Sequence, residues 1–465
     1  MRRWLLPSSG ALLIGLVAAV VVARSDTLPE TLGRTTELPA PPPAAPDQAP
    51  APDVERVVLR APEVPARATP LPYEVPSSEL VATAYYLDAP IFDHPGREPE
   101  VMGLLRRGRA LEVAERAFGA GCPDGGAWYR LAAGGYACTK LGFFVTSSPV
   151  ERAQRHVSPD THLPYRYASV RRGIGALRLH RRPHADERAK LDALRADPEA
   201  DKPEVVDLRM EGDYFVAIDE EEDGWVRTVR GRYLRADDLD ETPTSRLVGS
   251  TLGELRLPLA FVYGEPRPVH RVDEGVAREV GEAEPYARFT VRARPEVSGA
   301  RYVANDEGLA LLRDHVRVAR RVARPERVPP GSRWIHVDLG EQTLVAYEGD
   351  RPVYATLVAT GREGYETPRG TFRIREKHVG ATMRGEDPVD GPYEVEEVPW
   401  TQYYWRSYAI HGAYWHDGFG QVRSHGCTNL APADARHLFG WTSPRVPDGW
   451  HARRLRPGTW LHFTR

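Results

Sequence analysis

"RWIHVDLGEQTLVAYEGDRPVYATLVATG", residues 333–361, is the stretch that decides the fold class. Apolar residues alternate at Ile335, Val337 and Leu339, and two further apolar runs follow at 344–347 and 353–358. The segments between them, LGEQ and EGDRP, have the composition of turns. Alternation with a period of two, interrupted by short turns, is typical of neighbouring antiparallel strands. The stretch therefore predicts a β meander.

The sequence around this meander extends the same domain. ETPRGTFRIRE (366–376) places a Pro/Gly turn before another strand, and GTWLHF (458–463) supplies a closing strand. NLAPADARHLFGW (429–441) predicts a short helix that begins near Pro432, because proline is favoured in the first turn of a helix. We expect a mainly β, sandwich-like domain over residues 331–464, separated from what precedes it by the proline-rich segment 324–331.

Three shorter β segments precede this domain, at residues 79–150, 160–245 and 250–323. Each combines short apolar strands with glycine-containing turns, and they resemble the small SH3-like barrels of bacterial cell-wall proteins. The third copy is degenerate. In the second, the charged segment 180–203 predicts a helical insertion, and the acidic run 219–223 predicts a solvated turn, since it lacks the ligand spacing and glycine of an EF-hand calcium loop.

The N-terminus has the pattern of an export signal. Met1-Arg2-Arg3 precedes an apolar run over residues 10–23, with small residues at its end. We expect residues 1–25 to be a signal peptide or an uncleaved membrane anchor. Residues 26–78 are rich in proline and alanine, which predicts a disordered linker. The formal net charge of −3 gives no basic surface that would favour nucleic acid.

The chain has 465 residues and only three cysteines. In an oxidising compartment paired cysteines form disulfides, and Cys122 and Cys138 lie on two predicted strands around a turn, so we expect them to bridge. Cys427 is then left over. An unpaired cysteine in an exported protein is usually a reactive thiol or an intermolecular bridge, and the rarity of cysteine here favours the reactive thiol.

The surroundings of Cys427 favour nucleophilic catalysis. In RSHGCTNL (423–430) the thiol follows His425 and Gly426, and His411 ends a predicted apolar strand. An imidazole within reach can take the thiol proton, which would give a thiolate–imidazolium pair and acyl transfer through a thioester without a cofactor. His425 meets the thiol only if the segment is extended. Backbone N–H groups near Gly426 would face an oxyanion. An inert buried thiol, or a zinc site made by His411, His416, His425 and Cys427, is the alternative, although no zinc-motif spacing is present.

HGAYWHDGFGQVRSHGCTNL (411–430) closely resembles the signature of the L,D-transpeptidase catalytic domain, the YkuD fold, over roughly residues 331–464. The opening strands and the TPRGTF turn support the resemblance. It implies that Cys427 is the nucleophile and His411 its base. It also implies oxyanion or substrate-binding positions at His425, Gly426, Ser424, Asn429 and Trp415.

The resemblance implies a peptidoglycan L,D-transpeptidase that acts on stem peptides containing meso-diaminopimelate, in cell wall cross-linking or remodelling. Carbapenem-type inhibitors are expected to acylate it. An L,D-carboxypeptidase, an endopeptidase and a non-catalytic wall-binding scaffold are the alternatives. We expect the protein in the periplasm or cell wall, where the SH3-like segments would contact the wall polymer. The insertion at 377–405 is where a lid would lie, although its aromatic end could equally be core.

Overall fold

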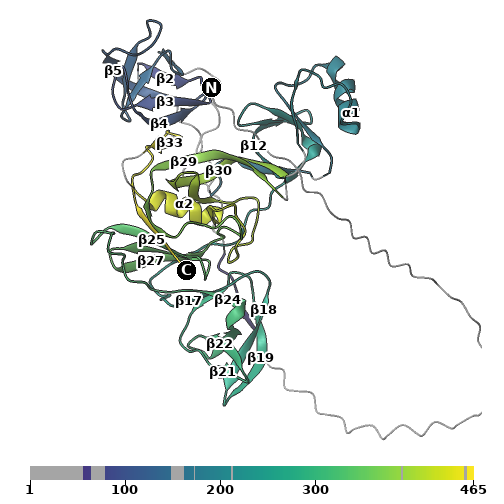
Figure 1. Cartoon of the computed structure of the whole chain (residues 1–465), viewed down its shortest axis with the longest axis vertical. Coiled ribbons are helices and arrows are strands. Elements are labelled where there is room, and N and C mark those ends of the chain that lie inside the picture. The colour runs from purple at the N-terminus through teal and green to yellow at the C-terminus, as the bar shows by residue number, and fades with distance from the viewer. Residues whose placement is uncertain are drawn as a thin grey trace, which may run out of the picture. The chain divides into compact units, whose positions relative to one another are not determined.

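The computed structural model describes residues 56–63, 79–147, 162–171, 173–210, 213–388, 391–454 and 458–465. The expected signal or anchor at residues 1–25, and most of the expected linker at 26–78, lie outside these ranges. The described residues are mainly β, as predicted, with two α-helices (Figure 1). Among these residues, no helix has the length and apolar character needed to cross a membrane.

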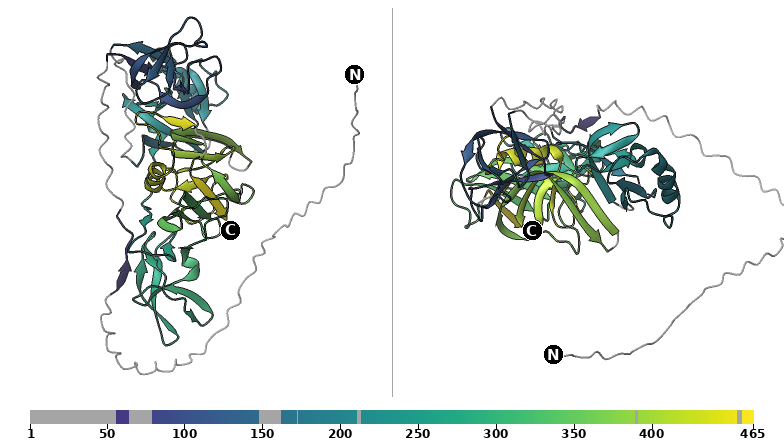
Figure 2. Two further views of the ribbon diagram at one scale, coloured as in Figure 1. Left: turned by 90° about the vertical axis from the view of Figure 1, so that its left-hand side faces the viewer. Right: turned by 90° about the horizontal axis from the view of Figure 1, so that it is seen from above.

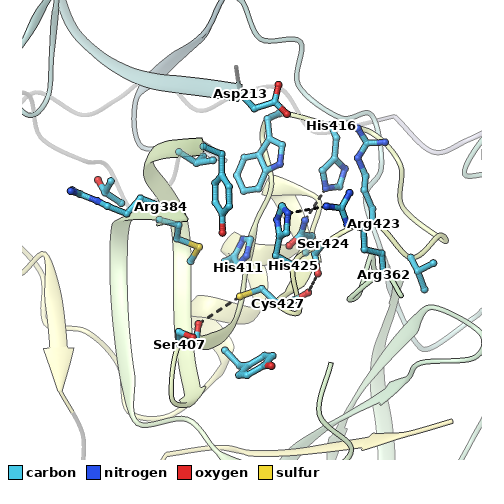
Figure 3. A pocket seen from close by; sticks show the side chains of 18 of the residues that line it. Asp213, Arg362, Arg384, Ser407, His411, His416, Arg423, Ser424, His425 and Cys427 are labelled. Carbon is cyan, nitrogen blue, oxygen red and sulfur yellow. Dashed lines mark hydrogen bonds between the residues drawn. The ribbon is translucent and has the colours of Figure 1, made fainter. Parts of the chain in front are cut away.

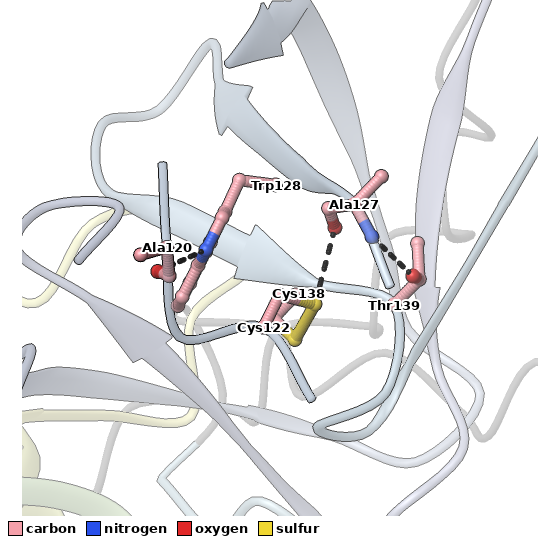
Figure 4. The surroundings of a disulfide bond; sticks show 6 residues. All are labelled: Ala120, Cys122, Ala127, Trp128, Cys138 and Thr139. Carbon is pink, nitrogen blue, oxygen red and sulfur yellow. Dashed lines mark hydrogen bonds between the residues drawn. A yellow bond between two sulfur atoms is a disulfide. The ribbon is translucent and has the colours of Figure 1, made fainter. Parts of the chain in front are cut away.

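The first module has seven strands and one disulfide. In order of pairing, the strands run β8–β2–β5–β6–β7–β3–β4. Cys138, at the end of β7, is joined to Cys122 in the loop before β6, with 5.7 Å between the Cα atoms (Figure 4). The indole N–H of Trp128 donates to the Ala120 carbonyl at 3.0 Å beside this bond. The strands are β2 (Val81–Ala84), β3 (Asp88–Phe92), β4 (Val101–Arg106), β5 (Ala110–Ala117), β6 (Trp128–Leu131), β7 (Tyr136–Cys138) and β8 (Phe143–Thr146).

The second module repeats this strand order. Its pairing runs β15–β9–β12–β13–β14–β10–β11, so that in both modules the first strand lies between the last and the fourth. Helix α1 (Arg188–Ala196) lies in the charged segment between the second and third strands, and the run 219–223 ends the fourth strand at an exposed turn. The strands are β9 (Arg166–Val170), β10 (Ala176–Leu179), β11 (Val206–Met210), β12 (Asp213–Glu222), β13 (Trp225–Thr228), β14 (Tyr233–Arg235) and β15 (Leu239–Glu241).

The third module has the same connections once more. β24 pairs with β17, β17 with β20, β22 with β23, β23 with β18 and β18 with β19. An isolated bridge joins Ala293, three residues after β20, to Ala304 at the end of β22. The three segments therefore share one topology; their assignment as SH3-like stays a prediction. The strands are β17 (Leu259–Val262), β18 (Arg267–Asp273), β19 (Val276–Ala283), β20 (Arg288–Thr290), β21 (Glu296–Val297), β22 (Ala300–Ala304), β23 (Leu309–Leu312) and β24 (Val316–Ala319).

Part of the expected linker is structured. β1 (Val57–Leu59) pairs in parallel with the end of β19, and Val57 and Leu59 pack on the core of the third module. Gly281 permits this pairing, because a Cβ at that position would lie 1.7 Å from the Val57 carbonyl oxygen. The prediction of a disordered linker is therefore wrong for this segment, where three apolar, strand-favouring residues occur without proline.

Two sheets form the C-terminal domain. The first is ordered β16–β27–β26–β25–β34–β28, and it contains the predicted meander (β25–β27) and closing strand (β34). The second is ordered β33–β29–β30–β31–β32. Their strands are β16 (Ser250–Thr251), β25 (Arg333–Asp338), β26 (Thr343–Glu348), β27 (Arg351–Leu357), β28 (Gly370–Arg373), β29 (Glu376–Asp387), β30 (Gly391–Trp405), β31 (Tyr408–Gly412), β32 (Thr428–Leu430), β33 (Ala452–Arg454) and β34 (Trp460–Thr464).

Helix α2 (Pro432–Trp441) packs into one core with both sheets. Ile335 and Leu344 of the first sheet, Trp400 and Ile410 of the second, and Leu438 of α2 belong to the same buried cluster. Figures 1 and 2 show α2 between β29 and β30 on one side and β25 and β27 on the other. The helix begins at Pro432, as the sequence predicts.

The insertion at 377–405 is the long hairpin β29–β30. Its aromatic end is core: Trp400 and Tyr404 are each only 2% exposed and belong to the cluster shared by both sheets. Residues nearer the tip line a cavity, which is described next. The core role of the aromatic end is thus confirmed, while the role of the hairpin as a lid stays a prediction.

Candidate active site

A cavity of about 730 Å³ opens beside Cys427 (Figure 3). The hairpin β29–β30 forms one wall, and the loop between β31 and β32 forms another. The residues that line it include the predicted site residues His411, Trp415, Ser424, His425, Cys427 and Asn429. Sequence positions that are distant from one another thus meet at one cavity.

Strand pairing brings His411 and Cys427 to the same face of the second sheet. β31 and β32 are parallel, with His411 opposite Asn429. Because side chains two residues apart point to the same side of a strand, Cys427 is expected to share the face of Asn429 and His411. In the view of Figure 3 the His411 ring lies next to the sulfur. Gly426 makes the bend before Cys427 at φ +112°, where a Cβ would lie 2.6 Å from the Tyr408 ring.

His411 has the environment of a neutral proton acceptor. Its side chain is buried, and Nδ1 lies 3.1 Å from the Gly412 carbonyl oxygen. A carbonyl only accepts, so Nδ1 carries the proton and Nε2 keeps a free lone pair. Burial lowers the pKa of His411 to about 4, partly offset by the bond to Gly412. The imidazole is therefore unprotonated at neutral pH and able to receive a proton.

Burial keeps the thiol of Cys427 protonated at neutral pH. Burial raises the pKa of the half-buried Cys427 to about 11, and a hydrogen bond from the Ala409 N–H offsets this only in part. The thiol points to the Ser407 carbonyl oxygen, 3.7 Å from the sulfur. With the imidazole pKa below that of the thiol, the expected thiolate–imidazolium pair is not the resting state. Attack by this thiol on a substrate would require a neighbouring base to take up its proton.

Ser424 and Thr367 fix the loop that carries Cys427. Ser424 Oγ accepts from the Gly426 N–H at 3.0 Å and donates to the Cys427 carbonyl at 2.5 Å. Thr367 Oγ1 donates to the Gly426 carbonyl at 2.8 Å. The Gly426 N–H, predicted to face an oxyanion, is thus occupied. The Cys427 N–H has no hydrogen-bond partner among the described residues and remains as the backbone donor there. The only indication of Thr367 in the sequence was its place in the TPRGTF turn.

His425 turns away from Cys427 and toward the tip of the hairpin. Its Nε2 donates to Asp387 at 2.8 Å, and its ring stacks on Tyr393 with centroids 4.8 Å apart. Arg362 pairs with the same carboxylate. The bend at Gly426 explains this direction, since the segment is not extended. Asp387 gave no signal in the sequence, because it lies among several acidic residues of a polar insertion.

Asn429 bonds to His416. Its side-chain amide lies 2.8 Å from His416 Nε2, and the Gly418 N–H donates to His416 Nδ1 at 3.2 Å. Nδ1 therefore accepts and Nε2 carries the proton. The atom of Asn429 that faces Nε2 in the structure is Nδ2, so we assign the amide in the flipped orientation, in which its oxygen accepts from the ring. Burial lowers the pKa of His416 to about 3, which keeps the ring neutral. His411, His416 and His425 each bond to a different partner, and the described residues contain no cluster suited to a metal ion.

The rest of the cavity carries charge of both signs. Arg362, Arg384 and Arg423 line it, together with Asp213 from β12 of the second module. Trp415 stacks on His411 with centroids 5.8 Å apart. A ligand with both carboxylate and ammonium groups would find complementary charge in this cavity.

Comparison with known proteins gives a family for this domain. The family model for the L,D-transpeptidase catalytic domain (YkuD) matches residues 332–459. No curated protein matches the chain. Solved structures that resemble it include a cysteine-to-serine mutant of the Enterococcus faecium L,D-transpeptidase, with 24% identity over 32% of this chain and 55% of that one, TM-score 0.24.

Two further structures are similar in the same region. The catalytic domain from the E. faecium enzyme acylated by ertapenem shows 25% identity over 30% of this chain and all of that one, TM-score 0.24. The L,D-transpeptidase from Mycobacterium smegmatis shows 18% identity over 37% of this chain and 80% of that one, TM-score 0.24. The chain spans about half of the first E. faecium structure. Residues 332–459 belong to the YkuD family of L,D-transpeptidase catalytic domains.

Proposed function

We propose that the protein is a peptidoglycan L,D-transpeptidase with Cys427 as nucleophile and His411 as general base. The family match of residues 332–459 supports the reaction class. The observation that carries the residue assignment is the cavity shared by Cys427 and a buried, neutral His411 whose Nδ1 is held by Gly412. Cys427 is the only free cysteine of the chain.

In the acylation step Cys427 Sγ attacks the carbonyl carbon of the penultimate residue of a tetrapeptide stem, and the thiol proton passes to His411 Nε2. The Cys427 N–H stabilises the negative charge that develops on the carbonyl oxygen. When the C–N bond breaks, the terminal D-amino acid leaves with the proton from His411. A thioester on Cys427 remains.

In the second step an amine attacks the thioester. His411 takes one proton from the amine, the C–S bond breaks, and the thiolate recovers the proton as a new amide forms. If water attacks, the same intermediate gives an L,D-carboxypeptidase, and acylation at an existing cross-link gives an endopeptidase. Water exclusion from the cavity would decide between these outcomes.

The charges around the cavity support a stem peptide that contains meso-diaminopimelate. This residue carries both a free carboxylate and an amine. Arg384 and Arg423 are exposed at the cavity and suit the carboxylate, while Asp213 suits an ammonium group. We further propose export to the periplasm or cell wall, supported by the N-terminal sequence pattern and the disulfide between Cys122 and Cys138.

Intact-protein mass spectrometry tests the assignment. A carbapenem should add one drug mass to the wild-type chain and none to Cys427→Ala. Incubation with a soluble tetrapeptide should release the terminal D-residue only when Cys427 and His411 are both present. An adduct that persists in Cys427→Ala, or wild-type turnover in that variant, would exclude Cys427 as the nucleophile. Cross-linked and trimmed muropeptides, separated by chromatography, distinguish transpeptidase from carboxypeptidase.

A further inference from the structure

We propose that the second module (residues 162–241) is a positioning element of the active site, which holds the hairpin β29–β30 and Trp415 in place beside His411. The effect on turnover that we expect from this module rests on the function proposed above. It assigns to this module a role other than contact with the wall polymer.

The first argument is a continuous sheet. β12 of the second module pairs in parallel with β30 of the hairpin, with Asp213 opposite Tyr393 and Phe215 opposite Val395. Parallel pairing between segments this far apart in the chain requires the module to be in place. The part of β30 that pairs with β12 contains Tyr393 and Val395, which line the cavity.

The second argument is a set of polar contacts to the segment EVEEV (394–398) of β30. Arg178 Nη1 donates to Glu394 Oε1 at 2.8 Å, and the Ala217 N–H donates to Glu396 Oε2 at 3.3 Å. Tyr167 donates its hydroxyl proton to the Glu397 carbonyl at 2.8 Å. Glu396 and Glu397 are at most 1% exposed. Burying carboxylates without partners is costly, so this acidic segment depends on the groups that the modules supply.

The third argument is a line of aromatic contacts that ends at the proposed base. Tyr167 stacks on Tyr414 at a centroid distance of 3.7 Å. Phe215 lies 6.1 Å from Trp415, and Trp415 stacks on His411 at 5.8 Å. Phe215 and Trp415 both pack against one buried cluster that combines the module and the catalytic domain. Phe215 therefore supports the ring that covers His411.

The fourth argument is the composition of the cavity wall. Among the described residues that line the cavity, Asp213, the first residue of β12, is the only one outside residues 332–459. The first module also contacts the hairpin, through the pair of Arg106 with Glu397, but none of its described residues lines the cavity. The positioning role thus falls to the second module.

The test compares Phe215→Ala and Arg178→Gln with a matched control in the full chain. Arg181→Gln removes an exposed ion pair with Glu187 inside the same module, 2.7 Å long and remote from the hairpin contacts. We expect kcat/KM on a soluble tetrapeptide to fall about 10- to 100-fold in the two test variants and to stay at the wild-type value in Arg181→Gln. Phe215→Leu, which keeps an apolar contact, should restore most of the rate.

A second readout separates positioning from general stability. If loss of Phe215 admits water to Trp415 and His411, the pKa of His411 should rise from about 4 toward its ordinary value. NMR titration of His411 should show this rise in Phe215→Ala, and the acidic limb of the rate profile should move with it. An unchanged pKa together with wild-type kcat/KM in Phe215→Ala and Arg178→Gln would overturn the proposal. If the wild type itself has no turnover, the proposed function fails, while the titration still decides the positioning role.

Discussion

Asp387, the last residue of β29, accepts a hydrogen bond from Nε2 of His425 at 2.8 Å. The contact joins the tip of the hairpin to the loop that carries Cys427, because His425 lies two residues before the thiol. Arg362 holds the same carboxylate from a third segment. The cavity wall and the thiol are thus positioned by one buried charge.

Replacing Asp387 tests whether its carboxylate joins the hairpin tip to the loop that carries Cys427. Asp387→Asn keeps the size of the side chain but removes the negative charge that pairs with Arg362 and His425. We expect kcat to fall about 10-fold, since a displaced loop misaligns the thiol without removing it. Alkylation of Cys427 by iodoacetamide should change much less. In a double-mutant cycle, Arg362→Gln should add little to Asp387→Asn; fully additive losses would contradict a shared role.

The pKa values of the reacting pair predict a pH dependence. Because burial raises the pKa of Cys427 to about 11, its alkylation rate should keep rising up to that pH instead of levelling near the ordinary thiol value. Stopped-flow alkylation across pH 6–11 measures this. A plateau in the alkylation rate below pH 8 would show that the resting thiol is already ionised.

For the proposed base, His411→Ala should lower turnover by roughly 10²–10⁴-fold.

Lys377 should stabilise the C-terminal end of α2. Its buried Nζ donates to the Phe439 and Thr442 carbonyls at 2.6 and 3.0 Å and to Thr442 Oγ1 at 2.9 Å. Lys377→Met leaves these acceptors unpaired, at a cost of about 1–3 kcal/mol each in a buried site and less where the structure relaxes. Thermal unfolding should show a clear loss of Tm. The exposed Lys190→Met on α1 is the control.

The direction in which the Tm loss of Lys377→Met changes with pH follows from the pKa of Lys377. Burial lowers the pKa of Lys377 to about 7 from its ordinary value of 10.5, so the unfolded chain binds more protons than the folded one between these values. The contribution of Lys377 to stability therefore falls as the pH drops from 10.5 through 7. The Tm difference between wild type and Lys377→Met should be larger at pH 9 than at pH 6. The opposite trend would contradict the assignment.

The buried carboxyl group of Glu396 should give the opposite pH dependence of stability. Burial and the neighbouring Glu397 raise its pKa to about 8, with the Ala217 N–H, Arg230 and Glu394 also facing it. The folded chain then binds the extra proton between the ordinary value and 8, so stability is lost as the pH rises through this range. Glu396→Gln should lose less Tm than wild type between pH 6 and 9. Equal losses in both proteins would show that Glu396 is ionised when buried.

The strand β1 can be tested through Gly281. Gly281→Val would place a side chain against the Val57 carbonyl and should release β1 from β19. We expect proteolysis near residues 57–63 to become faster, with little change in catalysis. Gly253→Ala, where a Cβ meets nothing within 4 Å, is the control. An unchanged cleavage pattern would mean that β1 does not depend on this close approach.

The sequence predicted the C-terminal fold because its signals are local. Alternation at Ile335, Val337 and Leu339 and the proline at 432 each specify a strand or helix within a few residues. The signature around Cys427 predicted a set of site residues, and the structure places all of that set except Gly426 in the lining of one cavity.

The features of the fold and site that the sequence did not predict depend on contacts between distant segments, which no local pattern encodes. Asp387 contacts His425, which lies 38 positions further along the chain, and Phe215 of the second module contacts Trp415 of the catalytic domain. The side chain of His425 points away from Cys427 because the chain bends at Gly426. The Gly426 N–H is occupied because the rotamer of Ser424 brings its hydroxyl oxygen within hydrogen-bond distance. β1 was missed because three apolar residues in a proline-rich segment are too short a signal for a strand until its partner, β19, is known.

The pairing of β1 with β19 also sets how the chain would respond to tension. The segment before Val57 connects to the rest of the chain through β1, whose backbone is held by β19. Two residues after β1, the Ala61 N–H donates to Glu284 at 3.0 Å. A pull on the N-terminal side would therefore be resisted first by the third module, although that module comes last of the three in the sequence. Until β1 detaches, the pull would not pass along the chain to the first module.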